Sequence, residues 1–197
     1  MKLKINLAGD MSPKLLEVIK DAVNNNAQYV LSHFKRTNPN DHSQIKKFQE
    51  KIRDYLELNT EWKWEEEQSL SDESKVSVDI LGNLNAKKCI IEIDTVRHDQ
   101  ISAKFVSRLA LAGLKESIDY VAILYDSTQK SGPQQAQTYI GYMANIMHHI
   151  NRKSTVTGIY IQVDKNSGIH KVYIWPTSPK KVNICLLNIF KYLISRF

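Results

Sequence analysis

Apolar and polar residues alternate along two short segments near the middle of the chain, and this period of two predicts β-strands. The first strand, residues 76–81, has two faces composed of Val76, Val78 and Ile80 against Ser77, Asp79 and Leu81. The second, residues 89–95, divides in the same way into Cys89, Ile91 and Ile93 against Ile90, Glu92 and Asp94. The polar segment between them, residues 82–87, predicts that the two strands form a hairpin.

The remaining apolar residues predict helices on both sides of this hairpin, because many of them recur at steps of three and four. The helical segments are residues 13–58, interrupted at 37–41, and then about 99–112 and 133–150. Further strands are expected at residues 120–125, 156–163 and 169–175, and a packed helix at residues 182–197.

This order of elements predicts an α/β fold, a three-layer sandwich in which helices cover a mixed central β-sheet. The chain has 197 residues, of which 42% are hydrophobic, enough for one well-filled core and few for two. We therefore expect a single domain over residues 1–197, with a helical N-terminal part at about 12–58 and the acidic hairpin at about 74–96.

The register of the hairpin decides whether its acids meet. If the turn centres between Asn85 and Ala86, Asp79 lies directly opposite Glu92, about 5 Å away, and Asp94 follows on the same face. Two carboxylates about 4 Å apart repel by roughly 4 kcal/mol at an effective dielectric near 20. A divalent cation such as Mg²⁺, which prefers oxygen ligands, would relieve this repulsion. The same alternation also marks the solvated face of an antiparallel hairpin, and the spacing alone leaves both interpretations open.

Composition adds a preference for polyanionic partners and for a reducing compartment. The formal charge is +6, which suits a protein that neutralises phosphates. The two cysteines, Cys89 and Cys185, lack the spacing of a zinc site. The N-terminal residues lack the apolar region of a signal peptide, and the apolar run 182–197 is interrupted and too short to span a membrane. We therefore expect a cytoplasmic protein without a membrane partner.

The acidic hairpin resembles the D…(D/E)-x-K core of the PD-(D/E)XK nucleases, in the variant form of the type II restriction endonucleases BamHI and BglII. The third position here is Asp94, where many family members carry lysine and this branch does not. The likeness extends from about Ser77 to Ile161 and includes the segments Asp79–Gly82, Ile101–Ala103, Leu109–Lys115, Ile118–Leu124, Gln135–Gln137 and Gly158–Tyr160.

The resemblance implies roles for particular residues. Asp79 and Glu92, with the backbone carbonyl of Ile93, would bind Mg²⁺, for which Mn²⁺ is the expected substitute. Asp94 would orient or deprotonate the attacking water, and Glu66 is the candidate for a glutamate upstream of the hairpin. The residues implied to contact DNA are Arg97, His98, Lys104 and Arg108. A homodimer that reads a palindrome is implied as well.

The sequence and the resemblance together lead us to expect a Mg²⁺-dependent endonuclease of double-stranded DNA, a type II restriction enzyme that cuts a short palindrome. One alternative is a nuclease of the same fold without sequence specificity, acting in repair or defence. Another is a catalytically inactive DNA-binding or dimerisation module. No glycine-rich phosphate loop is present in the sequence, so we expect no nucleotide cofactor.

Overall fold

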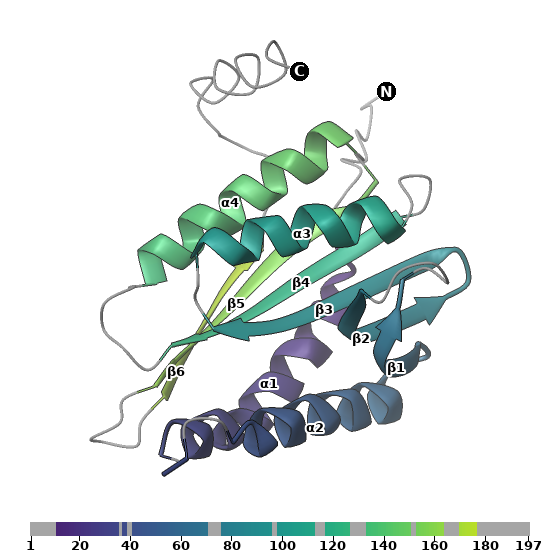
Figure 1. The fold of residues 1–197 in the computed structure, drawn as a ribbon. Coiled ribbons are helices and arrows are strands. Elements are labelled where there is room, and N and C mark those ends of the chain that lie inside the picture. The colour runs from purple at the N-terminus through teal and green to yellow at the C-terminus, as the bar shows by residue number, and fades with distance from the viewer. Residues whose placement is uncertain are drawn as a thin grey trace, which may run out of the picture.

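A six-stranded sheet forms the centre of the computed structural model, which describes residues 11–35, 37–38, 41–70, 76–95, 98–112, 117–126, 133–150, 153–163 and 170–176. The side chains of residues 95, 98–102, 111–112, 170 and 176 lie outside this description. The strands are β1 (Lys63–Ser69), β2 (Ser77–Leu84), β3 (Lys87–Thr95), β4 (Ser117–Asp126), β5 (Thr155–Val163) and β6 (His170–Pro176). They lie side by side in their order along the chain (Figure 1).

The sheet is mixed, as the sequence predicts. Strands β3, β4 and β5 are parallel to one another, whereas β1 with β2, β2 with β3, and β5 with β6 are antiparallel pairs. The central strand β4 is buried from Tyr120 to Tyr125, which fits a strand covered on both faces.

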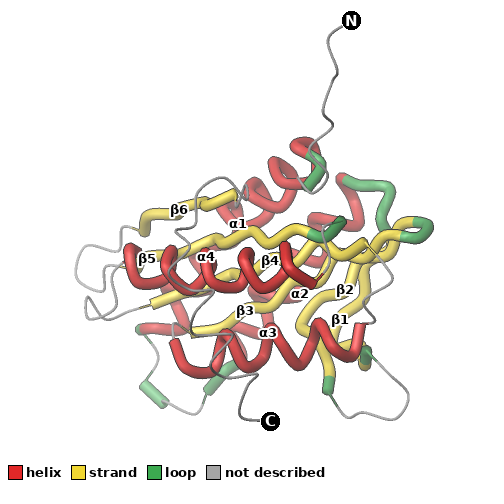
Figure 2. The backbone as a smooth tube through the Cα atoms, turned by 90° about the horizontal axis from the view of Figure 1, so that it is seen from above, coloured by secondary structure: helices red, strands yellow, loops and turns green. Residues whose placement is uncertain are grey.

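Helices cover both faces of the sheet. The helices α1 (Pro13–Phe34) and α2 (Ser43–Asn59) lie on one face, and α3 (His98–Ala112) and α4 (Pro133–Ile150) lie on the other (Figures 1 and 2). Each face has its own cluster of buried side chains, one with α1 and α2 and one with α3 and α4. The expected three-layer α/β sandwich is therefore confirmed. None of the described helices is both long and apolar enough to cross a membrane, and the predicted helix at 182–197 lies outside the described residues.

The register of the β2–β3 hairpin is the predicted one. Its pairs run from Leu84 with Lys87 to Ile80 with Ile91, so the turn consists of Asn85 and Ala86. Asn85 has a φ of 54°, a left-handed conformation that asparagine tolerates in tight turns. Continued by one step, this register places Asp79 opposite Glu92.

The faces of the two strands follow the prediction in β3 but not throughout β2. In β3, Cys89 is buried in the α1–α2 cluster and Ile90 in the α3–α4 cluster, as expected. In β2, however, Ile80 packs in the α1–α2 cluster and Val78 packs in the α3–α4 cluster. Val78 and Ile80 do not share a face, because the strand is irregular at Asp79, between them.

Candidate functional site

Helix α3 is anchored on the sheet by its apolar stripe, and this anchoring decides where its cations lie. Phe105 and Leu109 are buried. The Phe105 ring packs edge-to-face on the ring of Tyr120 on β4, with the ring centroids 4.9 Å apart. Lys104 and Arg108 are four residues apart, so they lie one helical turn apart on one side of this stripe. The docking of α3 therefore turns both cations towards the acids of β3.

Each acid of β3 receives one of these cations. The Nε atom of Arg108 donates to Oε1 of Glu92 at 2.8 Å, and Lys104 Nζ donates to Oδ2 of Asp94. Glu92 is only 6% exposed, and the Lys104 side chain, at 40%, is the most exposed of the four. The two ion pairs therefore differ in exposure. The pair of Arg108 with Glu92 is shielded from solvent, whereas the pair of Lys104 with Asp94 is open to solvent at Lys104.

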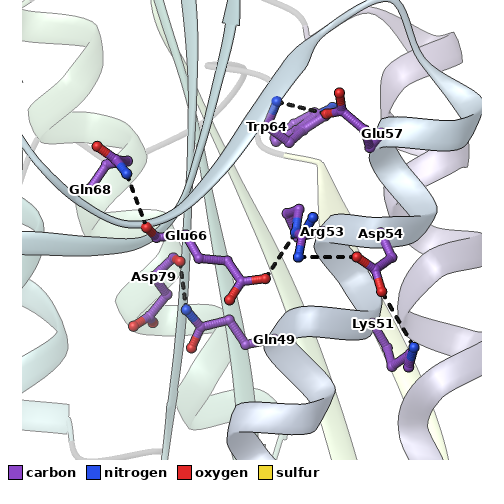
Figure 3. Close-up of polar contacts among 9 residues, drawn as sticks. All are labelled: Gln49, Lys51, Arg53, Asp54, Glu57, Trp64, Glu66, Gln68 and Asp79. Atoms are coloured by element: carbon purple, nitrogen blue, oxygen red, sulfur yellow. Dashed lines mark hydrogen bonds and ion pairs between the residues drawn. The ribbon is translucent and has the colours of Figure 1, made fainter.

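Asp79 joins this group from β2 through both its side chain and its backbone. Its Oδ2 accepts a hydrogen bond of 2.6 Å from the backbone N–H of Ile93, so the carboxylate stands in for a backbone acceptor at the end of the hairpin ladder. Its carbonyl accepts a bond of 2.7 Å from Nε2 of Gln49 on α2 (Figure 3). The carboxylate is thereby held against β3 at Ile93, the residue that follows Glu92.

Burial and like charge make this site electrostatically strained. Burial, and after it the negative charge of Asp79, raise the pKa of Glu92 to about 7, against the opposing effect of Arg108. Burial also raises the pKa of Asp79, and the charge of Asp94 acts in the same direction, whereas the Ile93 N–H bond lowers it. These acids are not the solvated face of a hairpin, since Glu92 is buried and Asp79 is largely so.

The oxygen donors present suit a hard divalent cation, although not through three converging acids. Within the described residues, no three His, Cys, Asp or Glu side chains form a group that could hold a metal ion. Asp94 is instead neutralised by Lys104. The available set is two carboxylates, those of Asp79 and Glu92, with the neighbouring carbonyl of Ile93, and such oxygens are ligands that Mg²⁺ accepts alongside water.

Glu66 does not lie with these acids. It belongs to β1, and its Oε1 accepts a bond of 2.9 Å from Nε of Arg53 on α2 (Figure 3). Trp64, two residues earlier on the same face of β1, is buried in the α1–α2 cluster. Glu66 therefore faces α2, on the opposite side of the sheet from Glu92.

The residues implied to contact DNA are described only in part. Arg97 and the side chain of His98 lie outside the described residues. Lys104 and Arg108 share a face of the helix, and that face is turned towards the acids.

Gln49, which donates to the carbonyl of Asp79, is a site residue that the sequence reasoning missed. Gln49 is 7% exposed and lies between Phe48 and Ile52, which are fully buried. It comes four residues after Ile45 and three before Ile52, and is thus on the apolar stripe of α2. A glutamine at such a position needs a hydrogen-bond partner inside the protein. Its place on the apolar stripe is the signal by which the sequence could have identified Gln49.

Comparison with known proteins assigns no family to the chain. No family model matches the chain, and no curated protein matches it. Among solved structures, it is similar to Pyrococcus furiosus SfsA, determined in complex with Ca²⁺, with a TM-score of 0.31 and 12% sequence identity. The similarity covers 68% of this chain and 61% of that one, so the chain matches about three fifths of the length of SfsA. A likeness of this degree supports no statement about activity.

Proposed function

We propose that this protein is a Mg²⁺-dependent endonuclease of double-stranded DNA, of the type II restriction kind. The observation that carries the proposal is the buried acid pair Asp79 and Glu92 at the end of the β2–β3 hairpin, with the cations of α3 facing it. Burial and the charge of Asp79 raise the pKa of Glu92, and a perturbed pKa of this kind is typical of sites that serve chemistry.

Different residues of the chain would bind the metal ion and the phosphate. Asp79 and Glu92, with the carbonyl of Ile93, would be the ligands of Mg²⁺. When bound, this ion would lower the pKa of a water molecule and offset the charge that gathers on the phosphate. Arg108 neutralises Glu92 in the protein without metal, which keeps the buried acid compatible with the fold.

The more open ion pair suits contact with the DNA backbone. Lys104 is partly exposed, and its ammonium group is held beside the acids by Asp94. A phosphate oxygen that approaches the acid pair would meet this ammonium group, which compensates the repulsion between phosphate and carboxylates. Asp94, once it shares Lys104 with the phosphate, can accept a hydrogen bond from the attacking water and orient it.

The substrate and the assembly follow from the sequence resemblance and from charge. An overall charge of +6 favours binding to a polyanion. A homodimer would present two such sites with two-fold symmetry, which matches a palindromic DNA site.

A second candidate function is supported by the ion pairs themselves. Each acid of β3 already has a cation, Arg108 for Glu92 and Lys104 for Asp94. Charges that are satisfied within the protein need no metal. The protein would then be a DNA-binding or dimerisation module of the same fold without catalysis.

Cleavage of supercoiled plasmid and of long linear DNA separates these functions. The wild-type protein should cut in the presence of Mg²⁺ and not in EDTA, whereas Glu92→Gln should not cut. The matched control is Glu17→Gln, on the exposed surface of α1, which should cut like wild type. Discrete fragments indicate a restriction enzyme and a smear indicates a nuclease without specificity. DNA binding without cutting on a broad set of sequences supports the inactive module.

A further inference from the structure

The backbone of β2 leaves the regular sheet at Asp79. Strands β1 and β2 are paired on both sides of this residue, at Glu66 with Ile80 and at Gln68 with Val78. Among the described residues, Asp79 itself has no paired residue in either neighbouring strand. Glu67, which the register places opposite it, has a φ of 48°, a conformation that glutamate rarely adopts. The candidate metal ligand is thus at an irregular point, and its position has to be fixed by other contacts.

Gln49 supplies one of these contacts from the helix layer. Its Nε2 donates to the carbonyl of Asp79 at 2.7 Å, from a side chain that is almost entirely buried (Figure 3). The neighbouring Phe48 and Ile52 are fully buried in the core, so the helix turn that carries Gln49 is held in place. A buried hydrogen bond of this kind is costly to lose, because the carbonyl stays buried while its Gln49 donor is removed.

A second contact, one helical turn further along α2, holds β1 in the same region. The Nε atom of Arg53 donates to Oε1 of Glu66 at 2.9 Å, and the guanidinium group also contacts Asp54 at 3.2 Å (Figure 3). Helix α2 therefore binds β1 and β2 beside the irregular position. With the carbonyl of Asp79 directed towards α2, its carboxylate is left to accept the N–H of Ile93 on β3.

We propose that Gln49 is a positioning residue for the carboxylate of Asp79, acting through the backbone of that residue. The positioning itself does not depend on catalysis. Its consequence, that Gln49 increases the affinity of the acid pair for a divalent cation, rests on the function proposed above.

The first test uses the metal-free protein. Gln49→Met keeps the length of the side chain and removes the donor. Gln49→Leu also lacks the donor and serves if the methionine variant does not fold. The matched control is Gln68→Met, because Gln68 also donates through Nε2 to a backbone carbonyl, that of Glu66, at 3.3 Å (Figure 3).

The readout is hydrogen exchange of the Ile93 backbone amide, followed by NMR. We expect this amide to exchange about tenfold faster in the Gln49 variants, which corresponds to the loss of about one hydrogen bond. In Gln68→Met the rate should stay at the wild-type value. A folded Gln49 variant whose Ile93 amide exchanges like wild type would overturn the proposal.

The second test measures Mn²⁺ binding by calorimetry on the same variants. Outer contacts of metal ligands typically change affinity by roughly 10- to 100-fold, so Gln49→Met should bind more weakly by about that factor, and Gln68→Met should not. If all three proteins bind Mn²⁺ equally, the consequence for metal binding is refuted. If the wild-type protein binds no Mn²⁺ but Ile93 responds to Gln49, the positioning role stands and the proposed nuclease function fails.

Discussion

Glu92 should make the metal-free protein less stable as the pH rises, and Glu92→Gln should remove this dependence. Burial and the charge of Asp79 raise the pKa of Glu92 from an ordinary value of 4.5 to about 7. Between these values the folded protein holds a proton that the unfolded chain has released, so a higher pH favours unfolding. At about 1.4 kcal/mol per pKa unit, the gap corresponds to a loss of about 3 kcal/mol.

The assay is urea denaturation in EDTA at several pH values from 4.5 to 8. The quantity of interest is the difference in free energy of unfolding between wild type and Glu92→Gln, because other titrating groups largely cancel in it. We expect this difference to change by about 3 kcal/mol across the range, with wild type losing stability as the pH rises. The difference in free energy of unfolding between wild type and Glu17→Gln, on the exposed surface of α1, should not change with pH. A flat difference for Glu92, or a wild-type protein that gains stability with pH relative to the variant, would refute the reasoning.

Three further substitutions test the packing of the site and of the fold, each by urea denaturation. Arg108→Met leaves Glu92 buried without its cation and should lower the free energy of unfolding by on the order of 2 kcal/mol at pH 8, whereas adding Glu92→Gln should restore most of it. Gly82→Ala places a Cβ atom 2.5 Å from Cζ3 of Trp64 and should cost about 1–3 kcal/mol; an unchanged stability would contradict the close contact. Gly141→Ala, in the interior of α4, meets open space and should stabilise by about 0.5–1 kcal/mol.

The hairpin could be predicted because its signals are local. The alternation in β3 and the turn at Asn85 and Ala86 together set which residues pair, and a register error would have turned every side chain to the wrong face. The expected position of Asp79 opposite Glu92 followed from that register alone. The order of the other helices and strands, apart from β1, was recoverable for the same reason.

The strand β1 was missed because its sequence lacks the apolar alternation of a half-buried strand. Between Lys63 and Glu67 only Trp64 is buried, so the segment resembles an acidic loop. As an edge strand, β1 leaves most of its side chains in contact with water. The irregularity opposite Asp79 lies in this strand, so it could not be predicted from the sequence either.

The partners of the acids depend on how helices dock, which spacing does not reveal. Lys104 and Arg108 could be assigned to one face of their helix, but not to contact with Asp94 and Glu92. The family resemblance implied instead that they contact DNA. The three acids were expected to need a metal ion for charge balance, whereas the fold supplies two cations of its own.

Calorimetric titration of the wild-type protein with Mn²⁺ at pH 7.5 tests the central claim most directly, namely that the buried pair Asp79 and Glu92 is a metal site. We expect saturable binding to the wild-type protein and to Glu17→Gln, and loss of that heat in Asp79→Asn and in Glu92→Gln while both remain folded by circular dichroism. A wild-type protein that gives no binding heat, or an Asp79→Asn variant that binds as tightly as wild type, would contradict it.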